Sequence, residues 1–293
     1  MKITEGYMPY LKYKTYYRIV GKCTGNKKPL LLLHGGPGST HNYFEVLDKA
    51  AEDGRALIMY DQLGCGLSSI PSRPNLWNAE TWIEELIQLR KYLNLDEVHL
   101  LGQSWGGMMA IQYACQYKPK GIKSYILAST LPSSTLWKKE QRRRIKYLPQ
   151  KMQNAIAEAE KTGDYSSEKY REAESEFMLR YCASPVSPDS PECLRRPKTA
   201  GSESYLTAWG QNEFTPTGTL KDFDFLEEIQ NIQEPCLITS GLTDLCSPLI
   251  AKTMYDKIPN SEWELFEFSR HMAFVEENKK YIKILTNWLN KND

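Results

Sequence analysis

The segment VHLLGQSWGGMMAIQYA, residues 98–114, constrains the fold more than any other part of the chain. An apolar run leads into Gly102, Ser104 and Gly106, and an apolar stretch with helix-forming residues follows. A strand that turns into a helix through G-x-S-x-G holds its serine on a strained turn, with the hydroxyl exposed and the helix N-terminus beneath it. The glycines permit the close approach of strand and helix. The segment therefore predicts an α/β architecture and makes Ser104 a candidate nucleophile.

Short apolar runs recur along the chain with amphipathic stretches between them, as in a mostly parallel sheet covered by helices. Asn78 is placed to cap one helix, a second is expected just after Ser104, and a third near residues 276–289. The expected strands are residues 15–20, 30–33, 56–60, 98–101, 124–128, 236–239 and 263–266.

The alternation of strands and helices is interrupted between about residues 131 and 232. This stretch is rich in charged residues and helix formers, and then passes through the proline- and serine-rich loop SPVSPDSPECLRRPKTAG. We expect an α/β core formed by residues 1–130, a helical cap at 131–232, and the remainder of the core at 233–293. The basic cluster at 142–144 lies beside Glu140, and we interpret it as a solvated helix face.

The composition excludes several classes of function. The chain has 37 basic and 36 acidic residues, so it lacks the broad positive field that nucleic-acid binding requires. No segment approaches the roughly 20 apolar residues of a membrane span, and the N-terminus lacks the apolar core of a signal peptide. Seven scattered cysteines without a CxxC pair suit a reducing compartment and disfavour zinc. We expect a cytoplasmic protein, with loose cell-envelope association as the alternative.

The four histidines reduce the choice of a general base to one residue. A serine nucleophile needs a histidine and an acid, and in the chain order of α/β-hydrolases the histidine comes last. Only His271 follows the candidate serine, in a loop between a predicted strand and the last helix. The earlier histidines are His34, His41 and His99. His99 opens a predicted strand, where we expect either a surface position or a satisfied structural role.

The candidate acid lies in CLITSGLTDLCSP, where Asp244 directly follows an apolar run. In this arrangement Ser104 attacks an acyl carbon, His271 transfers its proton, and Asp244 orients the imidazole. The oxyanion that forms needs two N–H donors, and the backbone of Trp105 supplies one. The early loop HGGPG lacks the lysine and the spacing of a phosphate-binding loop, so we assign Gly36 as the second donor.

Several motifs together resemble the proline iminopeptidases, which remove an N-terminal proline: HGGPGST, YDQLGCGLSS, GQSWGG, NEFTPTG, and the late aspartate and histidine. The similarity extends over nearly the whole chain and is nearest to the forms of lactic acid bacteria. It implies an α/β-hydrolase fold with an inserted helical cap, no metal or cofactor, and a triad of Ser104, Asp244 and His271. The implied partners are short peptides with a free N-terminus, and a homo-oligomer is compatible with the sequence.

A free N-terminal amine in a closed pocket needs a carboxylate, because an unpaired buried charge is costly. The resemblance implies this role for Glu213 in NEFTPTG. Tyr205, Trp209 and Phe214 are candidates for the apolar walls around a pyrrolidine ring. Many members of the family carry a second amine-binding glutamate directly after the catalytic aspartate, where this chain has Leu245.

The expected function is that of a serine peptidase that releases an N-terminal residue, with proline preferred. Because of Leu245, three alternatives stay close: an aminopeptidase of broader specificity, a prolinase, and an amino-acid amidase. A carboxylesterase would use the same triad but would not need Glu213. An epoxide hydrolase or dehalogenase would carry an aspartate at the position of Ser104, and a binding module of this fold usually lacks a member of the triad.

Overall fold

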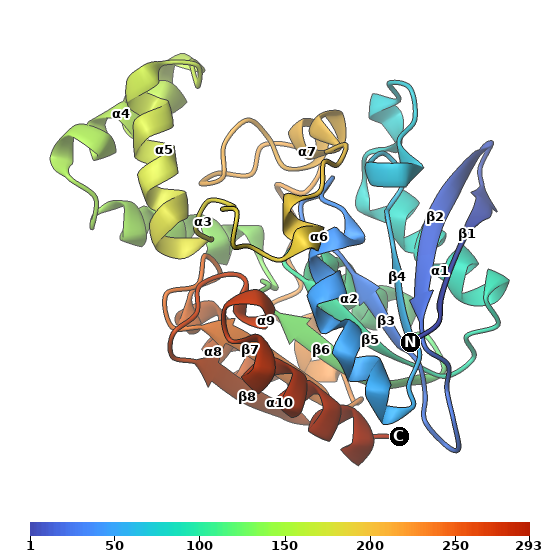
Figure 1. Ribbon diagram of the computed structural model, residues 1–293. Coiled ribbons are helices and arrows are strands. Elements are labelled where there is room, and N and C mark those ends of the chain that lie inside the picture. The colour runs from blue at the N-terminus through green and yellow to red at the C-terminus, as the bar shows by residue number, and fades with distance from the viewer.

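The computed structural model describes residues 1–293, arranged around one eight-stranded sheet with helices on both faces (Figure 1). The strand order is β1-β2-β4-β3-β5-β6-β7-β8. The β1–β2 and β2–β4 pairs are antiparallel, and all other pairs are parallel. This confirms the predicted mostly parallel α/β sheet. The strands are β1 (Ile3–Tyr10), β2 (Tyr13–Val20), β3 (Leu30–Leu33), β4 (Leu57–Tyr60), β5 (Val98–Gln103), β6 (Ile122–Ala128), β7 (Cys236–Gly241) and β8 (Ser261–Phe266).

The four leucines of β3 are fully buried because helices cover both faces of the sheet. Their side chains alternate, so Leu31 and Leu33 join the core on one face while Leu30 and Leu32 join the core on the other. None of the helices combines the length and the apolar composition that a membrane span requires. The first face is covered by α1 (Ala79–Tyr92), α2 (Trp105–Gln112) and α8 (Pro248–Lys257), and the second by the 3₁₀ segment His41–Asp53, α9 (Ala273–Glu276) and α10 (Asn278–Lys291).

Local sequence signals account for several element ends. The side-chain oxygen of Asn78 accepts a hydrogen bond from the N–H of Thr81 at 2.9 Å, as expected for the cap of α1. Strand β1 was not predicted, because Gly6 and Pro9 are typical of loops. It is an edge strand, where a proline is tolerated because not every N–H is needed for pairing. The helix predicted near residues 276–289 is α10, which begins two residues later and is preceded by the short α9.

Between β6 and β7 the chain leaves the sheet and forms the inserted segment, residues 131–232. Figure 1 shows its helices grouped above the sheet. The N–H of Gly201 donates to the carbonyl of Gly38 at 2.8 Å, and the N–H of Gly66 donates to that of Thr199 at 2.8 Å. The inserted segment therefore lies against the loops that follow β3 and β4. Its helices are α3 (Ser134–Ile145), α4 (Gln150–Thr162), α5 (Glu168–Tyr181), α6 (Glu192–Arg195) and α7 (Ser202–Ala208).

The basic cluster of α3 is only partly a solvated helix face. Arg142 and Arg143 are partly or largely exposed and form ion pairs with Glu160 and Glu140. Arg144, in contrast, is only 4% exposed. The interpretation from sequence was wrong for Arg144, because this face of α3 packs against the loop that follows β7.

Candidate active site

Ser104 lies at the turn from β5 into α2, with φ 55° and ψ −121°. A non-glycine residue rarely adopts a positive φ, so this turn is strained. Close packing surrounds it: a Cβ added to Gly106 would lie 2.0 Å from the carbonyl oxygen of Leu33, and one added to Gly102 would lie 2.3 Å from that of Gly106. Only glycine fits at these two positions. The strand and helix can therefore meet closely enough to leave the Ser104 side chain partly exposed.

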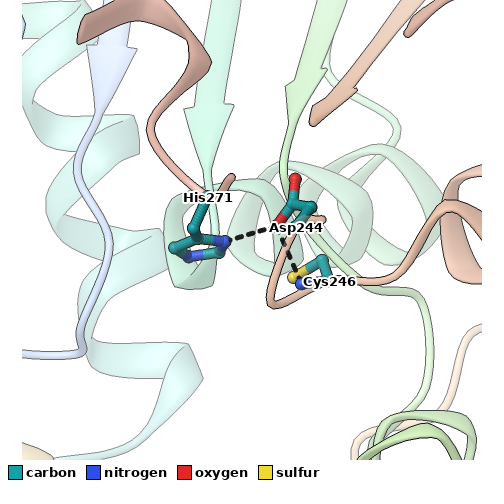
Figure 2. A group of neighbouring side chains, drawn as sticks. All are labelled: Asp244, Cys246 and His271. Carbon is teal, nitrogen blue, oxygen red and sulfur yellow. Dashed lines mark hydrogen bonds and ion pairs between the residues drawn. The ribbon is translucent and has the colours of Figure 1, made fainter. Parts of the chain in front are cut away.

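Asp244 and His271 form the buried pair that Figure 2 shows, with Nδ1 of the imidazole 2.8 Å from Oδ1 of the carboxylate. They follow β7 and β8, adjacent parallel strands whose carboxyl ends lie at the same edge of the sheet. The carboxylate also accepts the N–H of Cys246 at 2.8 Å and that of Gly241 at 3.2 Å. An acid held in this way keeps the imidazole proton on Nδ1, which leaves Nε2 to accept a proton.

The thiol of Cys246 completes a cluster in which three ligand-type atoms lie within 4.8 Å of one another. The cluster does not fit a tetrahedral zinc ion. Nδ1 of His271 and Oδ1 of Asp244 lie 2.8 Å apart, whereas two ligands on one tetrahedral Zn²⁺ are about 3.4 Å apart. Burial also raises the pKa of the Cys246 thiol well above its usual range, and zinc binds the thiolate.

The serine turn and the histidine loop are in contact. Gln103, directly before Ser104, donates from its side chain to the carbonyl of His271 at 3.4 Å. The hydroxyl of Ser104 forms no hydrogen bond with the imidazole of His271 in this structure. The structure thus joins the predicted acid and base directly and brings the predicted nucleophile to the same region. Hydrogen bonds of this kind often tighten only when substrate is bound.

The HGGPG loop after β3 lies directly against the serine. A Cβ added to Gly35 would lie 3.1 Å from the Cβ of Ser104. Gly36 has φ 114°, in the region that favours glycine, and its N–H has no backbone acceptor. Trp105 is the first residue of α2, so its N–H has no acceptor within the helix. Both predicted oxyanion donors are therefore available beside the serine turn.

The loop after β4 holds the HGGPG loop in place. The Nδ1 atom of His34 lies 2.8 Å from the carbonyl oxygen of Gly35, and Nε2 accepts the N–H of Gln62 at 3.0 Å. Burial lowers the pKa of His34 to about 4, so the ring is neutral. The side chain of Gln62 also accepts the indole N–H of Trp105 at 2.8 Å. Sequence reasoning missed this role of Gln62, although a polar residue just after a buried strand was a usable signal.

The other two early histidines have structural partners. His41 Nδ1 lies 2.7 Å from Oδ1 of Asp61. His99 is fully buried, with Nδ1 2.8 Å from the hydroxyl of Ser124. Of the two expectations for His99, the satisfied structural role is confirmed, and the surface position is wrong because the side chain is buried beside Ser124.

Glu213 lies in the inserted segment after α7 and is half-buried. Its carboxylate accepts the hydroxyl of Tyr205 at 2.6 Å, and its main-chain carbonyl accepts the indole N–H of Trp137 at 3.0 Å. Burial raises the pKa of Glu213, and the nearby His271 opposes this rise. None of the ion pairs in the structure includes Glu213. The site therefore contains a carboxylate near the histidine that has no basic partner.

The three aromatic candidates lie at different depths around Glu213. Tyr205 is partly exposed and bonded to the carboxylate. Trp209 is 4% exposed, and its indole N–H has no hydrogen-bond partner. Phe214 has no exposed surface and packs edge-on against Phe177, with ring centroids 4.9 Å apart. Phe214 thus supports the Glu213 loop from the interior of the inserted segment.

Comparison with known proteins assigns the chain to a family. A family model described as the alpha/beta hydrolase fold matches residues 28–278. A proline iminopeptidase of Clostridium botulinum is 82% identical over 293 residues, which cover all of both chains. The chain belongs to the proline iminopeptidase family. Both the family and the fold predicted from sequence are confirmed.

Two further proline iminopeptidases show the breadth of this similarity. That of Levilactobacillus brevis is 54% identical over 294 residues, covering 100% of this chain and 98% of the relative. The crystal structure of the Mycobacterium smegmatis protein has a TM-score of 0.87 at 26% identity, covering 99% of this chain and 98% of that one. The resemblance to lactic acid bacterial forms thus holds at 54% identity, and the clostridial relative is more similar.

In this member of the proline iminopeptidase family, Leu245 directly follows Asp244 and is 3% exposed. Its carbonyl accepts a side-chain N–H of Gln141 at 3.1 Å and one of Arg144 at 3.3 Å. The side chain at this position is apolar, so it supplies no second carboxylate. Sequence reasoning identified the leucine but missed both residues of α3 that hold its main chain.

Proposed function

We propose that the chain is a serine peptidase that releases an N-terminal residue, preferentially proline, from short peptides. The carboxylate of Glu213, half-buried near His271 without a basic partner, carries this proposal. A cationic amine completes such a site, because an unpaired buried charge is costly. A carboxylesterase has no use for that carboxylate. Membership of the proline iminopeptidase family supports the same substrate class.

In the proposed mechanism, Glu213 binds the free amine and positions the first peptide bond at the serine turn. The Oγ atom of Ser104 attacks the carbonyl carbon while Nε2 of His271 takes its proton. Asp244 holds the imidazole and stabilises its charged form.

The N–H groups of Gly36 and Trp105 stabilise the oxyanion of the tetrahedral intermediate. His271 then gives its proton to the departing amine, and an acyl-enzyme remains on Ser104. Water attacks the acyl group with His271 as the base. This step releases the free amino acid and restores the serine.

We also propose that the inserted segment, residues 131–232, is a cap over this site, between core parts 1–130 and 233–293. Two main-chain hydrogen bonds between the segment and the loops after β3 and β4 support this role. Tyr205 and Trp209 form the walls of the pocket for the first residue. Phe214 lies behind them and supports the position of the glutamate.

The proposed partners are short peptides with a free N-terminus, and the proposed location is the cytoplasm. All seven cysteines are free thiols, which suits a reducing compartment. A broader aminopeptidase is the second candidate function. Leu245 favours it, because a pocket with one carboxylate fewer binds the amine less tightly and depends more on the fit of the side chain.

A panel of substrates separates these functions. We expect the highest kcat/KM for a proline arylamide, lower values for alanine and leucine arylamides, and negligible turnover of N-acetylproline arylamide, which has no cationic amine. Equal values for the three free-amine substrates would establish the broader aminopeptidase. Turnover of a short-chain ester without turnover of any free-amine arylamide would refute the peptidase.

Replacing the nucleophile tests the proposed mechanism. We expect Ser104→Ala to reduce kcat by about 10³-fold or more, because attack, acyl transfer and proton transfer are lost together. The measurement is steady-state turnover of proline arylamide, with thermal unfolding as the check on folding. Near-normal turnover in the folded variant would assign the nucleophile to another residue.

A further inference from the structure

Arg144 of α3 is a buried cation without an ion-pair partner. Its exposed fraction is 4%, and no carboxylate oxygen lies within the 4.0 Å of an ion pair. Burial lowers the pKa of Arg144, and attraction to Asp244 opposes this effect. A desolvated guanidinium is costly unless its N–H groups are well bonded. The groups that accept hydrogen bonds from Arg144 therefore indicate its role.

These acceptors belong to the acid loop, residues 244–247. The Nη1 atom of Arg144 donates to the main-chain carbonyl of Asp244 and, at 3.3 Å, to that of Leu245. Gln141, about one turn earlier on α3, donates to the Leu245 carbonyl at 3.1 Å. The inserted segment thus holds the main chain of the acid itself and of the residue that follows it.

Two more contacts fix this arrangement. Glu140, on the same helix, accepts the hydroxyl of Ser247 at 2.6 Å, at the other end of the acid loop. The guanidinium carbon of Arg144 lies 4.5 Å from the ring centroid of Tyr181 in α5, a cation–π contact. Arg144 therefore connects two helices of the inserted segment to the acid loop.

We propose that Arg144 is a positioning residue for the catalytic acid, through which the inserted segment sets the orientation of Asp244 and of His271. The carboxylate of Asp244 is held by two N–H groups of its own chain segment, at Gly241 and Cys246. The main chain that carries it is held by α3. If the loop turns, the 2.8 Å bond to His271 is lost or bent, and proton transfer from Ser104 slows. This proposal rests on the catalytic assignments of the proposed function.

The test measures proton transfer at Ser104 independently of any peptide substrate. An alkyl fluorophosphonate reacts with the serine: Oγ forms a bond to phosphorus, fluoride leaves, and His271 takes the hydroxyl proton. Intact-mass spectrometry gives the rate. We expect Arg144→Met to lower this rate about 10- to 100-fold, the loss expected for a misplacement of about 1 Å. The KM for proline arylamide should change less than twofold, because the amine site is intact.

Two variants complete the test, with rates corrected for the folded fraction by circular dichroism. Arg144→Lys keeps the charge and one donor, so it should recover part of the rate. Arg171→Met removes an exposed arginine of α5 and should leave the rate unchanged. A wild-type labelling rate in Arg144→Met, or an equal loss in Arg171→Met, would overturn the proposal.

Two other outcomes are also informative: an Arg144→Met variant that does not fold, and a wild-type chain that is labelled but does not release proline. If Arg144→Met does not fold, Arg144→Lys decides: a threefold or larger fall at unchanged KM supports the proposal, and a wild-type rate overturns it. A wild-type chain that is labelled on Ser104 but does not release proline would refute the proposed function alone, because the labelling comparison needs no peptide substrate.

Discussion

In the proposed function, Glu213 is the residue that distinguishes an aminopeptidase from an esterase at this site. Both enzymes need the same nucleophile, base and acid, and neither the serine turn nor the Asp244–His271 pair depends on the charge of the substrate. The proposed role of the Glu213 carboxylate, which is half-buried and has no basic partner, does depend on the charge of the substrate. Burial raises the pKa of Glu213, and the hydrogen bond from the hydroxyl of Tyr205 opposes this rise. In the proposed function, the amine of the substrate supplies the positive charge that the site lacks.

We expect Glu213→Gln to raise the KM for proline arylamide about 10- to 100-fold, since a hydrogen bond to a charged group contributes about 1.5–3 kcal/mol. The KM for a short-chain ester should change little, because an ester presents no cation. Steady-state kinetics with both substrates measure the difference. Glu192→Gln, which removes a carboxylate on the surface of the inserted segment, is the matched control. An equal rise for both substrates would give Glu213 a purely structural role.

Among the elements, the contact of β3, β5 and α2 is the tightest around the site. The helix begins directly after Ser104, and its second residue, Gly106, lies against the carbonyl of Leu33 in β3. The same contact brings the HGGPG loop, which continues from β3, beside the serine. Sheet geometry thus positions the proposed nucleophile and one proposed oxyanion donor together.

Substituting Gly106 should therefore affect the whole fold. We expect Gly106→Ala to lower the free energy of unfolding by about 3 kcal/mol or more, because its Cβ would meet a backbone oxygen of a central strand that has no room to move. Gly163→Ala has open space around the new Cβ but a φ of 75°, so it should cost only about 1–2 kcal/mol. Urea unfolding measures both, and equal losses would contradict the packing argument.

At the scale of the whole molecule, the C-terminal residues contact the sheet through polar groups around the buried His99. Asp293 forms an ion pair with Arg55, and its carboxylate lies 3.4 Å from Nε2 of His99. The indole N–H of Trp288 donates to Ser124, which also bonds His99. Trp288 and Asp293, from the last turn of the chain, thus meet Arg55, His99 and Ser124 beside β5.

This arrangement predicts a loss of stability in acid. Burial, with the charge of Arg55, lowers the pKa of His99 to about 4, against about 6.5 in the unfolded chain. The unfolded state therefore binds the extra proton between these values, so the stabilisation is complete above pH 6.5 and declines as the pH falls towards 4. Between pH 7 and 5 the wild type should lose about 2 kcal/mol more than His99→Gln. Urea unfolding at both pH values measures this, and equal losses would contradict the assignment.

The sequence by itself determined the serine turn and singled out the histidine and the aspartate that pair in the structure, because each depends on a local pattern and on chain order. An apolar run before Gly102 and Ser104 specifies a strand and a tight turn, and only His271 follows the serine. Strand β1 was not predicted by the same reasoning, because Gly6 and Pro9 give this edge strand a composition typical of loops.

Only the tertiary structure decided which side chains support this site. The bond from Trp105 to Gln62 joins residues 43 positions apart, and the bond from Arg144 to Asp244 joins residues 100 positions apart. A charged helix such as α3 has the same local pattern whether its arginines face water or a loop. Burial of one arginine beside the acid follows from how the inserted segment packs on the sheet, and packing between distant elements is not encoded in any short stretch of sequence.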